Sequence, residues 1–302
     1  MKNFTAATIE TGETTIFARW FGSGPPLLLL HGFPQTHLMW RDIAPDLARD
    51  HTVVCADLRG YGQSGCPVSS PDHAPYAKRA LARDMVAVME RLGFPRFCVA
   101  GHDRGGRVAY RLALDHPERV ERLAVLDILP IDIVWERADS NFALGFWPFS
   151  LLAQPSPLPE TILRHSAEVI VDSALGQWGS SEAASKPDVR TAYVAALQNG
   201  EHPHAICEEY RAAASIDVAH DRADRAAGRK IQCPVLVLWS TDGPLDSWYA
   251  EGPLALWRGW ANDVTGHSVE GGHFFPEAAA EITTKALRGF FSGSVQDIGR
   301  GV

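Results

Sequence analysis

One short stretch of the chain, GHDRGG at residues 101–106, combines the residue types that a nucleophilic active site needs. Asp103 stands between small residues, directly after an apolar run, and glycines at such a place permit the tight strand-to-helix turn that exposes a central side chain. A carboxylate is ionised at neutral pH because its ordinary pKa is about 4, so it can displace a leaving group from saturated carbon without an activating base. The pattern predicts an aspartate nucleophile at position 103, with a helix N-cap as the alternative role.

Displacement by Asp103 would leave an ester, and hydrolysis of that ester requires water activated by a general base. His273 is the candidate base, because an ordinary pKa of about 6.5 suits this task. It follows two glycines late in the chain, and its alternative role is that of a structural histidine. Asp127, which ends another apolar run, would orient the imidazole and stabilise its charged form.

Two further features of this predicted site come from other parts of the chain. Asp242 and Asp246 are alternative sources of the acid that orients the histidine, although Asp127 is favoured. Ester hydrolysis develops an oxyanion, and the backbone N–H groups of Phe33 and Arg104 are predicted to bind it.

Two arginines follow the predicted nucleophile. Arg104 and Arg107 are three positions apart, which places both on one face of a helix. Guanidinium groups beside an anionic nucleophile suit a substrate that itself carries a carboxylate, and they also offset the repulsion between the two anions. The alternative is an ion pair with Asp103 or with a surface carboxylate. Arg111, a further turn away, is expected to pair elsewhere or to be solvated.

The elements that must position these groups can be read from the apolar pattern. Five continuous apolar runs, each bounded by turn residues, predict strands buried on both faces, at residues 26–30, 51–56, 97–100, 123–126 and 234–239. Segments with helical spacing lie between or after them, at residues 81–92, 107–115 and 278–291. The alternation predicts an α/β fold with a mostly parallel sheet and helices on both faces, whose functional groups gather at the carboxyl ends of the strands.

The strand pattern is interrupted once. Between about residues 131 and 229 the chain contains several aromatic residues, a proline-rich piece and alanine-rich helical segments, without a strand-like run. We therefore predict a core domain formed by residues 1–130 and 231–302, and a helical cap domain formed by residues 131–230.

Composition excludes several classes of function. The 302 residues are 46% hydrophobic and 21% charged, with a net charge of −8 and no long block of one sign, so we expect no nucleic-acid partner and no membrane partner. The N-terminus lacks an apolar core of signal-peptide length, which predicts a cytoplasmic protein. The five cysteines are scattered and form no CxxC pair, so neither a disulfide framework nor a metal site is expected.

Several stretches together resemble one known family: HGFPQTHLMW (31–40), DLRGYGQS (57–64), GHDRGGRVAYRLALDHPERV (101–120), LAQPSPLPE (152–160) and CEEYRAAASIDVAHDRAD (207–224). They span the core and the cap. The chain is similar to α/β-hydrolases of the Asp-nucleophile branch, and most similar to haloacetate (fluoroacetate) dehalogenases. The resemblance implies that Asp103, His273 and Asp127 convert a short 2-haloacid to a 2-hydroxy acid and halide, without cofactor or metal, in a homodimer.

The same resemblance assigns a halide site in the cap. Tyr210 matches the family tyrosine that donates a hydrogen bond to the departing halide, which a buried halide needs because desolvation is costly. Fluoroacetate dehalogenases pair that tyrosine with a His-Trp step, and Pro148 and Phe149 stand there in this chain. Trp147 supplies the second donor only if the loop is locally shifted. Fluoride depends most on several donors, so release of chloride or bromide is favoured over release of fluoride.

Two other functions remain open. An epoxide hydrolase uses the same Asp/His machinery, but it usually needs two cap tyrosines, and Tyr193 and Tyr210 are closer in sequence than that family's arrangement. Epoxide hydrolases and haloalkane dehalogenases also typically carry Trp at the position of Arg104. A ligand-binding protein without catalysis is the third reading, which an intact pair of Asp103 and His273 disfavours.

Overall fold

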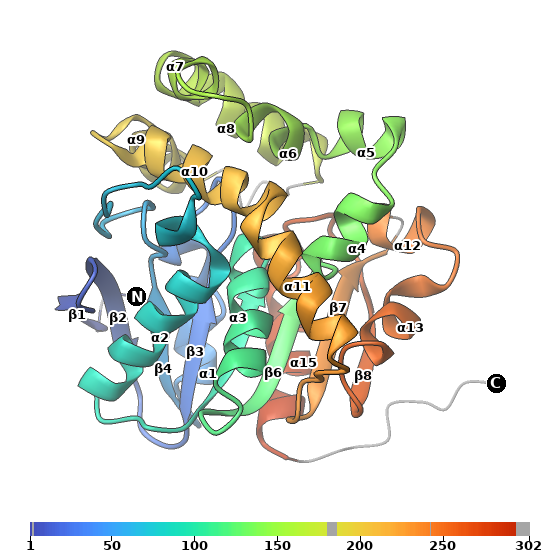
Figure 1. Cartoon of the computed structure of the whole chain (residues 1–302). Helices are drawn as coiled ribbons and strands as arrows, with labels where there is room; N and C mark the ends of the chain where they lie inside the picture. The colour runs from blue at the N-terminus through green and yellow to red at the C-terminus, as the bar shows by residue number, and fades with distance from the viewer. Residues whose placement is uncertain (2, 180–185, 242, 294–302) are drawn as a thin grey trace.

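The computed structural model describes residues 1, 3–179, 186–241 and 243–293, and its centre is an eight-stranded sheet (Figure 1). The spatial order is β1-β2-β4-β3-β5-β6-β7-β8, in which neighbours from β4 to β8 are parallel and β1 and β2 are antiparallel additions at one edge. The strands are β1 (Thr5–Glu10), β2 (Thr15–Phe21), β3 (Pro26–Leu30), β4 (Thr52–Ala56), β5 (Phe97–His102), β6 (Val120–Leu126), β7 (Val235–Ser240) and β8 (Val264–Val269). The prediction of a mostly parallel α/β sheet is confirmed.

Both faces of this sheet are covered, which explains the continuous apolar runs. Leu28 and Leu30 of β3 pack with residues of the helices on one face, whereas Leu27 and Leu29 pack on the other, and all four are fully buried. The covering helices are α2 (Lys78–Arg91) and α3 (Arg104–Asp115) on the first face, with α1 (Ala44–Leu47) and α15 (Ala280–Phe291) on the second (Figure 1).

The described residues between β6 and β7 form helices and no strand. These helices are α4 (Ile131–Glu136), α5 (Ser140–Gly145), α6 (Trp147–Leu152), α7 (Leu158–His165), α8 (Ala167–Gln177), α9 (Pro187–Gln198), α10 (His202–Ala214) and α11 (Ile216–Ala226). The insertion lies over one end of the sheet (Figure 1). This end holds the carboxyl ends of the strands, because Tyr210 of α10 packs edge-on against Phe33, which follows β3. The predicted helical insertion is confirmed.

The remaining short helices lie in connections of the core. They are η1 (His37–Trp40), η2 (Ala74–Tyr76), α12 (Pro244–Ser247), α13 (Gly252–Arg258) and α14 (Phe275–Ala278). The last of these directly follows the loop that carries the predicted base.

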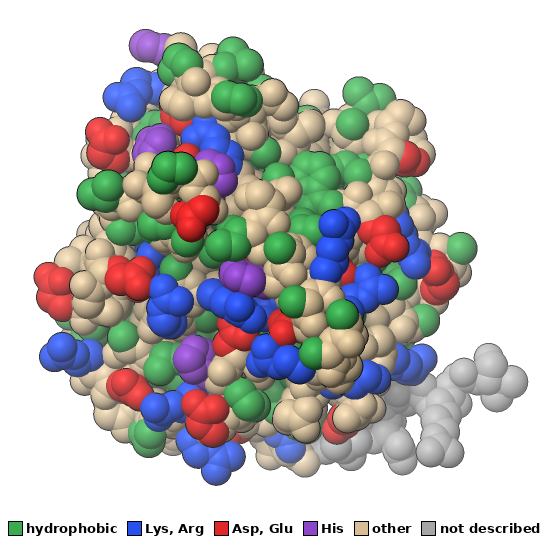
Figure 2. All heavy atoms as spheres, viewed as in Figure 1, with side chains coloured by type: hydrophobic (Ala, Val, Ile, Leu, Met, Phe, Trp, Pro, Cys, Tyr) green, Lys and Arg blue, Asp and Glu red, His purple; other side chains and the backbone are tan. Residues whose placement is uncertain are grey.

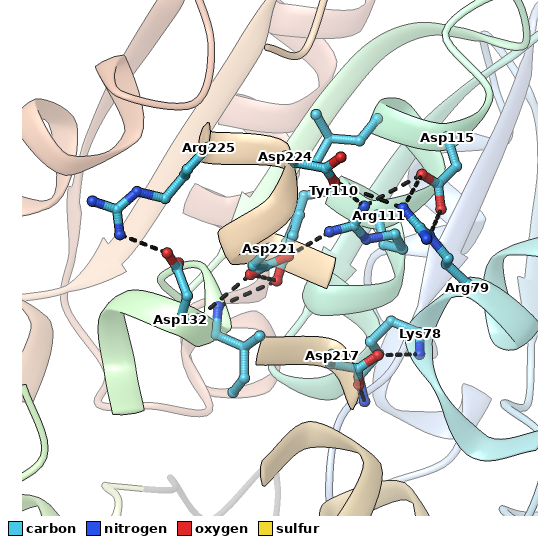
Figure 3. A network of polar contacts seen from close by, with 12 residues as sticks. Lys78, Arg79, Tyr110, Arg111, Asp115, Asp132, Asp217, Asp221, Asp224 and Arg225 are labelled. Carbon is cyan, nitrogen blue, oxygen red and sulfur yellow. Dashed lines mark hydrogen bonds and ion pairs between the residues drawn. The ribbon is translucent and has the colours of Figure 1, made fainter. Parts of the chain in front are cut away.

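A buried polar network fastens the insertion to the core (Figure 3). Arg111, on the helix that begins at the predicted nucleophile, forms ion pairs with Asp221 and Asp224 of α11. The Tyr110 hydroxyl donates a hydrogen bond to Asp221 over 2.8 Å and accepts one from the backbone N–H of Ile131 over 3.2 Å. The helix α3 is therefore tied to the segments through which the chain enters and leaves the insertion, and Arg111 pairs away from Asp103.

The surface charges are mixed in sign (Figure 2), and the cysteines are unpaired. Positive and negative side chains are interspersed on the face shown in Figure 2. All five cysteines are free. Within the described part of the chain, no helix is long and apolar enough to cross a membrane, and no group of three or more potential ligand side chains is arranged to hold a metal ion.

Candidate active site

The turn at Asp103 is the sharp strand-to-helix turn that the glycines predicted. Asp103 has φ 48° and ψ −117°, a left-handed conformation that a residue with a side chain adopts only under constraint. A Cβ on Gly101 would lie 2.3 Å from the carbonyl oxygen of Gly105, and a Cβ on Gly105 would lie 2.4 Å from that of His31. These glycines therefore let the backbone segments approach. Asp103 occupies the N-cap position of α3, but its side chain makes no capping hydrogen bond, so the alternative role as a side-chain cap is wrong.

The Asp103 carboxylate instead contacts the loop after β3 and the next turn of α3. Its Oδ1 accepts a hydrogen bond from the backbone N–H of Phe33 over 2.9 Å, and its Oδ2 lies 3.6 Å from Nη1 of Arg107. Burial alone would raise the pKa of Asp103, but the charges of His273, Arg107 and Arg104 outweigh it and lower that pKa to about 2. Asp103 is thus anionic at neutral pH.

His273 lies in the loop after β8 and faces the same carboxylate. Its Nδ1 is 2.6 Å from Oδ2 of Asp127, and its Nε2 is 3.9 Å from Oδ2 of Asp103. Asp127 is fixed in turn, because its Oδ1 accepts a hydrogen bond from the backbone N–H of Ser240 over 2.8 Å. With Nδ1–H donating to Asp127, Nε2 carries the free lone pair. Burial lowers the pKa of His273, but the hydrogen bond and charge of Asp127 more than compensate and raise it above its ordinary value.

Asp246, one of the two alternative acids, does not take this place. Asp246 accepts a hydrogen bond from Nε1 of Trp239 over 2.9 Å at an exposed position. Asp242 lies outside the described residues. The carboxylate that contacts the His273 imidazole through its Nδ1 is that of Asp127.

Arg104 is completely buried, and most of its guanidinium is already bound by a carboxylate. Its Nε lies 2.7 Å from Oε2 of Glu209 and its Nη2 lies 2.6 Å from Oε1 of the same side chain. The guanidinium carbon also stacks 4.0 Å from the centre of the Tyr210 ring. Its Nη1 has no hydrogen-bond partner among the described residues. One edge of Arg104 is therefore left for a further acceptor.

Arg107 is also buried, with 4% of the residue exposed, and it is less satisfied than Arg104. Neither its Nε nor its Nη1 has a hydrogen-bond partner among the described residues. Burial and the charge of Arg104 together lower the pKa of Arg107, although the nearby Asp103 opposes this. Buried N–H groups without acceptors are costly, so the pair of arginines forms a site that suits an anion.

Aromatic side chains of the insertion pack against the two arginines. Tyr210 is 3% exposed and packs edge-on against Phe149 at a ring distance of 5.8 Å. Phe149 also lies beneath both guanidinium groups, 5.0 Å from Arg107. Trp147 packs instead on Trp178 at 6.1 Å, and Trp178 in turn stands edge-on to the ring of His273. Phe149 therefore lies beside Tyr210, while Trp147 lies on the side of His273.

Sequence reasoning did not single out three residues of this region. Glu209 binds Arg104, and Lys78 binds Glu209 in turn. The ring of Trp178 contacts the ring of His273. The carbonyl oxygen of Trp178 also accepts a hydrogen bond from the backbone N–H of His273 over 2.7 Å. The sequence did offer a signal for Glu209. Two buried arginines require carboxylates nearby, and Glu209 is the acidic residue directly before Tyr210, which was already assigned to the site.

Comparison with known proteins agrees with this architecture. Residues 25–278 match the family model described as the alpha/beta hydrolase fold. A fluoroacetate dehalogenase from Burkholderia sp is 41% identical over 292 residues, which cover 96% of this chain and 95% of the relative. A soluble epoxide hydrolase from Corynebacterium sp. (strain C12) is 45% identical, but over only 36% of each chain.

Solved structures extend the likeness to three dimensions. The crystal structure of an α/β hydrolase from Nostoc sp PCC 7120 has a TM-score of 0.93 and 46% identity, covering 97% of this chain and 99% of the other. A Pseudomonas aeruginosa protein named as an epoxide hydrolase, solved as a variant with bound MFA, has a TM-score of 0.90 and 44% identity, covering 97% of each chain. The chain is therefore a hydrolase that belongs to the α/β-hydrolase fold family and lies close to the haloacetate dehalogenases.

Proposed function

We propose that this chain is a hydrolytic dehalogenase that converts a 2-haloacetate and water to glycolate, halide and a proton. The observation that carries the proposal is the pair of buried arginines beside Asp103, whose unpartnered N–H groups are Nη1 of Arg104 and Nε and Nη1 of Arg107. An anionic substrate matches these donors, whereas a neutral epoxide leaves them unsatisfied.

The first step is a displacement at carbon 2 of the haloacetate. The arginines hold the substrate carboxylate, Oδ2 of Asp103 attacks carbon 2, and the carbon–halogen bond breaks with its electron pair leaving on the halide. Oδ1, which accepts the Phe33 N–H, remains as the carbonyl oxygen of the new ester. Tyr210 is the donor that we assign to the halide, and Trp147 the second donor if its loop is shifted.

The second step hydrolyses the ester. His273 takes a proton from water through Nε2, and the resulting hydroxide attacks the ester carbon of Asp103. The N–H groups of Phe33 and Arg104 stabilise the oxyanion, while Asp127 stabilises the protonated His273. Collapse breaks the bond between the ester carbon and the glycolate oxygen, and His273 returns the proton to that oxygen. Asp103 is left as a carboxylic acid, which releases its proton to solvent and so becomes a carboxylate again.

An epoxide hydrolase is the alternative, and the cap tyrosines bear on it. The Tyr193 hydroxyl donates a hydrogen bond to Glu277 over 3.0 Å and is fully buried, so it is already engaged. A reaction that needs two free phenols to protonate an epoxide oxygen is poorly served by this arrangement.

Halide release and proton release from fluoro-, chloro- and bromoacetate, measured beside hydrolysis of styrene oxide, test the proposal. We expect turnover of chloroacetate and bromoacetate and little turnover of the epoxide. Turnover of the epoxide without release of halide from any haloacetate would refute it.

A base-deficient variant tests the mechanism separately. In His273→Ala the first step proceeds and the second stops, so a glycolyl ester of about 58 Da accumulates on Asp103 and is located by peptide mass spectrometry. Halide release without this adduct would indicate direct attack of water on the substrate.

A further inference from the structure

Glu209 lies on the same cap helix as Tyr210, α10, yet its side chain reaches into the core. It is completely buried and binds the guanidinium of Arg104 through both Nε and Nη2, at 2.7 and 2.6 Å. This two-point contact fixes the plane of the guanidinium as well as its position. The free Nη1 of Arg104 therefore has a direction that Glu209 sets.

Lys78, the first residue of α2, completes the arrangement. It is 2% exposed, its ammonium group pairs with Glu209, and the same group lies 3.4 Å from Oδ2 of Asp217 (Figure 3 shows the contact with Asp217). The backbone N–H of Lys78 also donates to Oδ1 of Asp217 over 2.9 Å. Lys78 is thus held firmly against Glu209 by a second cap carboxylate.

The charges show why such an arrangement matters at this place. Arg104 directly follows Asp103, and its charge helps to lower the pKa of that carboxylate. Nη1 of Arg107 already lies 3.6 Å from Oδ2 of Asp103, and a second guanidinium drawn onto this carboxylate would compete with the substrate for the oxygen that must attack. Glu209 counters this by occupying the Nε and Nη2 donors of Arg104. Its own negative charge would cancel that of Arg104, and the charge of Lys78 offsets this loss.

We propose that Glu209, supported by Lys78, is a positioning residue that presents Nη1 of Arg104 to the carboxylate of the substrate and keeps this guanidinium off Asp103. The proposal rests on the proposed function, because it assigns the same site a device for recognising the anionic end of the substrate. It also makes anion recognition depend on the cap, since Glu209 and Tyr210 are carried by one helix.

The test compares Glu209→Gln with Glu208→Gln, a matched change at the adjacent position of α10. Glu208 is also buried but pairs with Arg211, at 2.9 Å, and with His73. For each variant we measure KM and kcat for chloroacetate, kcat/KM for the neutral isostere 2-chloroacetamide, and the binding of acetate by calorimetry. Thermal melting identifies loss of folding.

We expect Glu209→Gln to weaken acetate binding and raise KM for chloroacetate by roughly tenfold or more, because one well-placed charged hydrogen bond accounts for such a factor. Turnover of 2-chloroacetamide should change much less, and Glu208→Gln should bind acetate as the unchanged protein does. Unchanged or tighter acetate binding by Glu209→Gln, or an equal loss for the neutral isostere, would overturn the proposal.

Two further measurements keep the outcomes separate. Lys78→Met removes the balancing charge without removing Glu209, and we expect it also to weaken acetate binding. Normal acetate binding by Lys78→Met would contradict the role given to Lys78. This variant also replaces Glu209→Gln in the test if Glu209→Gln does not fold. If the unchanged protein binds acetate but releases no halide from any haloacetate, the proposed function fails while the positioning role is still judged by calorimetry. If it binds no acetate, the positioning role is wrong.

Discussion

Arg107→Met removes one of the two guanidinium groups beside Asp103 and leaves the rest of the site in place. In the folded protein Nη1 of Arg107 is 3.6 Å from Oδ2 of Asp103, and the guanidinium carbon is 5.0 Å from the ring centre of Phe149. Methionine keeps an unbranched apolar stem of similar reach, so packing on Phe149 is largely retained. The change therefore isolates the charge and the two unpartnered N–H groups.

The size of the effect follows from these contacts. A hydrogen bond to a charged group contributes about 1.5 to 3 kcal/mol, which corresponds to a roughly ten- to hundredfold increase in KM for chloroacetate. Two unit charges 3.6 Å apart interact by about 4.6 kcal/mol at an effective dielectric constant of about 20, so loss of Arg107 also raises the pKa of Asp103 above about 2. A more basic carboxylate is no weaker as a nucleophile. The reaction of neutral 2-chloroacetamide should therefore be preserved.

Chloride release at several substrate concentrations measures this prediction, with Arg83→Met as the control. Arg83 lies on α2 with 54% of its side chain exposed and pairs with Glu13, so its replacement changes the net charge equally without touching the site. The reasoning is refuted if Arg107→Met leaves KM for chloroacetate unchanged, or if chloroacetate and 2-chloroacetamide lose activity to the same extent.

Two other changes probe the base and the halide site. Asp127 raises the pKa of His273 above its ordinary value of 6.5, so activity should fall as acid protonates His273. Asp127→Asn should lower the pKa of His273 and so move the acid limb of the pH–rate profile to lower pH. The same variant should reduce kcat by at least roughly tenfold. An acid limb that stays in place would contradict this assignment. Phe149→Trp adds an N–H donor beside Tyr210 and should raise the ratio of fluoride to chloride release by roughly tenfold or more, at a cost of about 1 to 3 kcal/mol in stability from overpacking. An unchanged ratio in a folded variant would show that the indole does not reach the halide.

The central strands were predictable because each is buried on both faces. The five apolar runs correspond to β3 through β7, and the helical spacing at residues 81–92 marks most of α2. The two edge strands, β1 and β8, and the antiparallel strand β2 beside β1 were missed. Their sequences mix threonine, charged residues or glycine with apolar residues, because an edge strand or a partly exposed strand needs fewer apolar side chains.

The part of the site that depends on strand ends was also predictable. Asp103 and Asp127 each directly follow a strand, and these two strands are parallel neighbours. Parallel neighbours have their carboxyl ends side by side, so the sequence alone placed the two aspartates at the same end of the sheet. The partner of Arg104 was not predictable in this way. Glu209 is 105 positions away in the insertion, whose packing over the core is decided by tertiary contacts rather than by local pattern.

The contact between Arg104 and Glu209 changes how the two arginines are understood. From sequence alone they looked equivalent, because both lie on the same face of one helix beside the nucleophile. In the folded chain Arg107 faces Asp103 with free donors, whereas Arg104 is held by the cap and offers only Nη1. Under the proposed function, the substrate anion meets one cation that also faces Asp103 and one whose Nε and Nη2 are bound by Glu209. The proposed positioning of Arg104 therefore requires that α10, which carries Glu209, stays packed over the core.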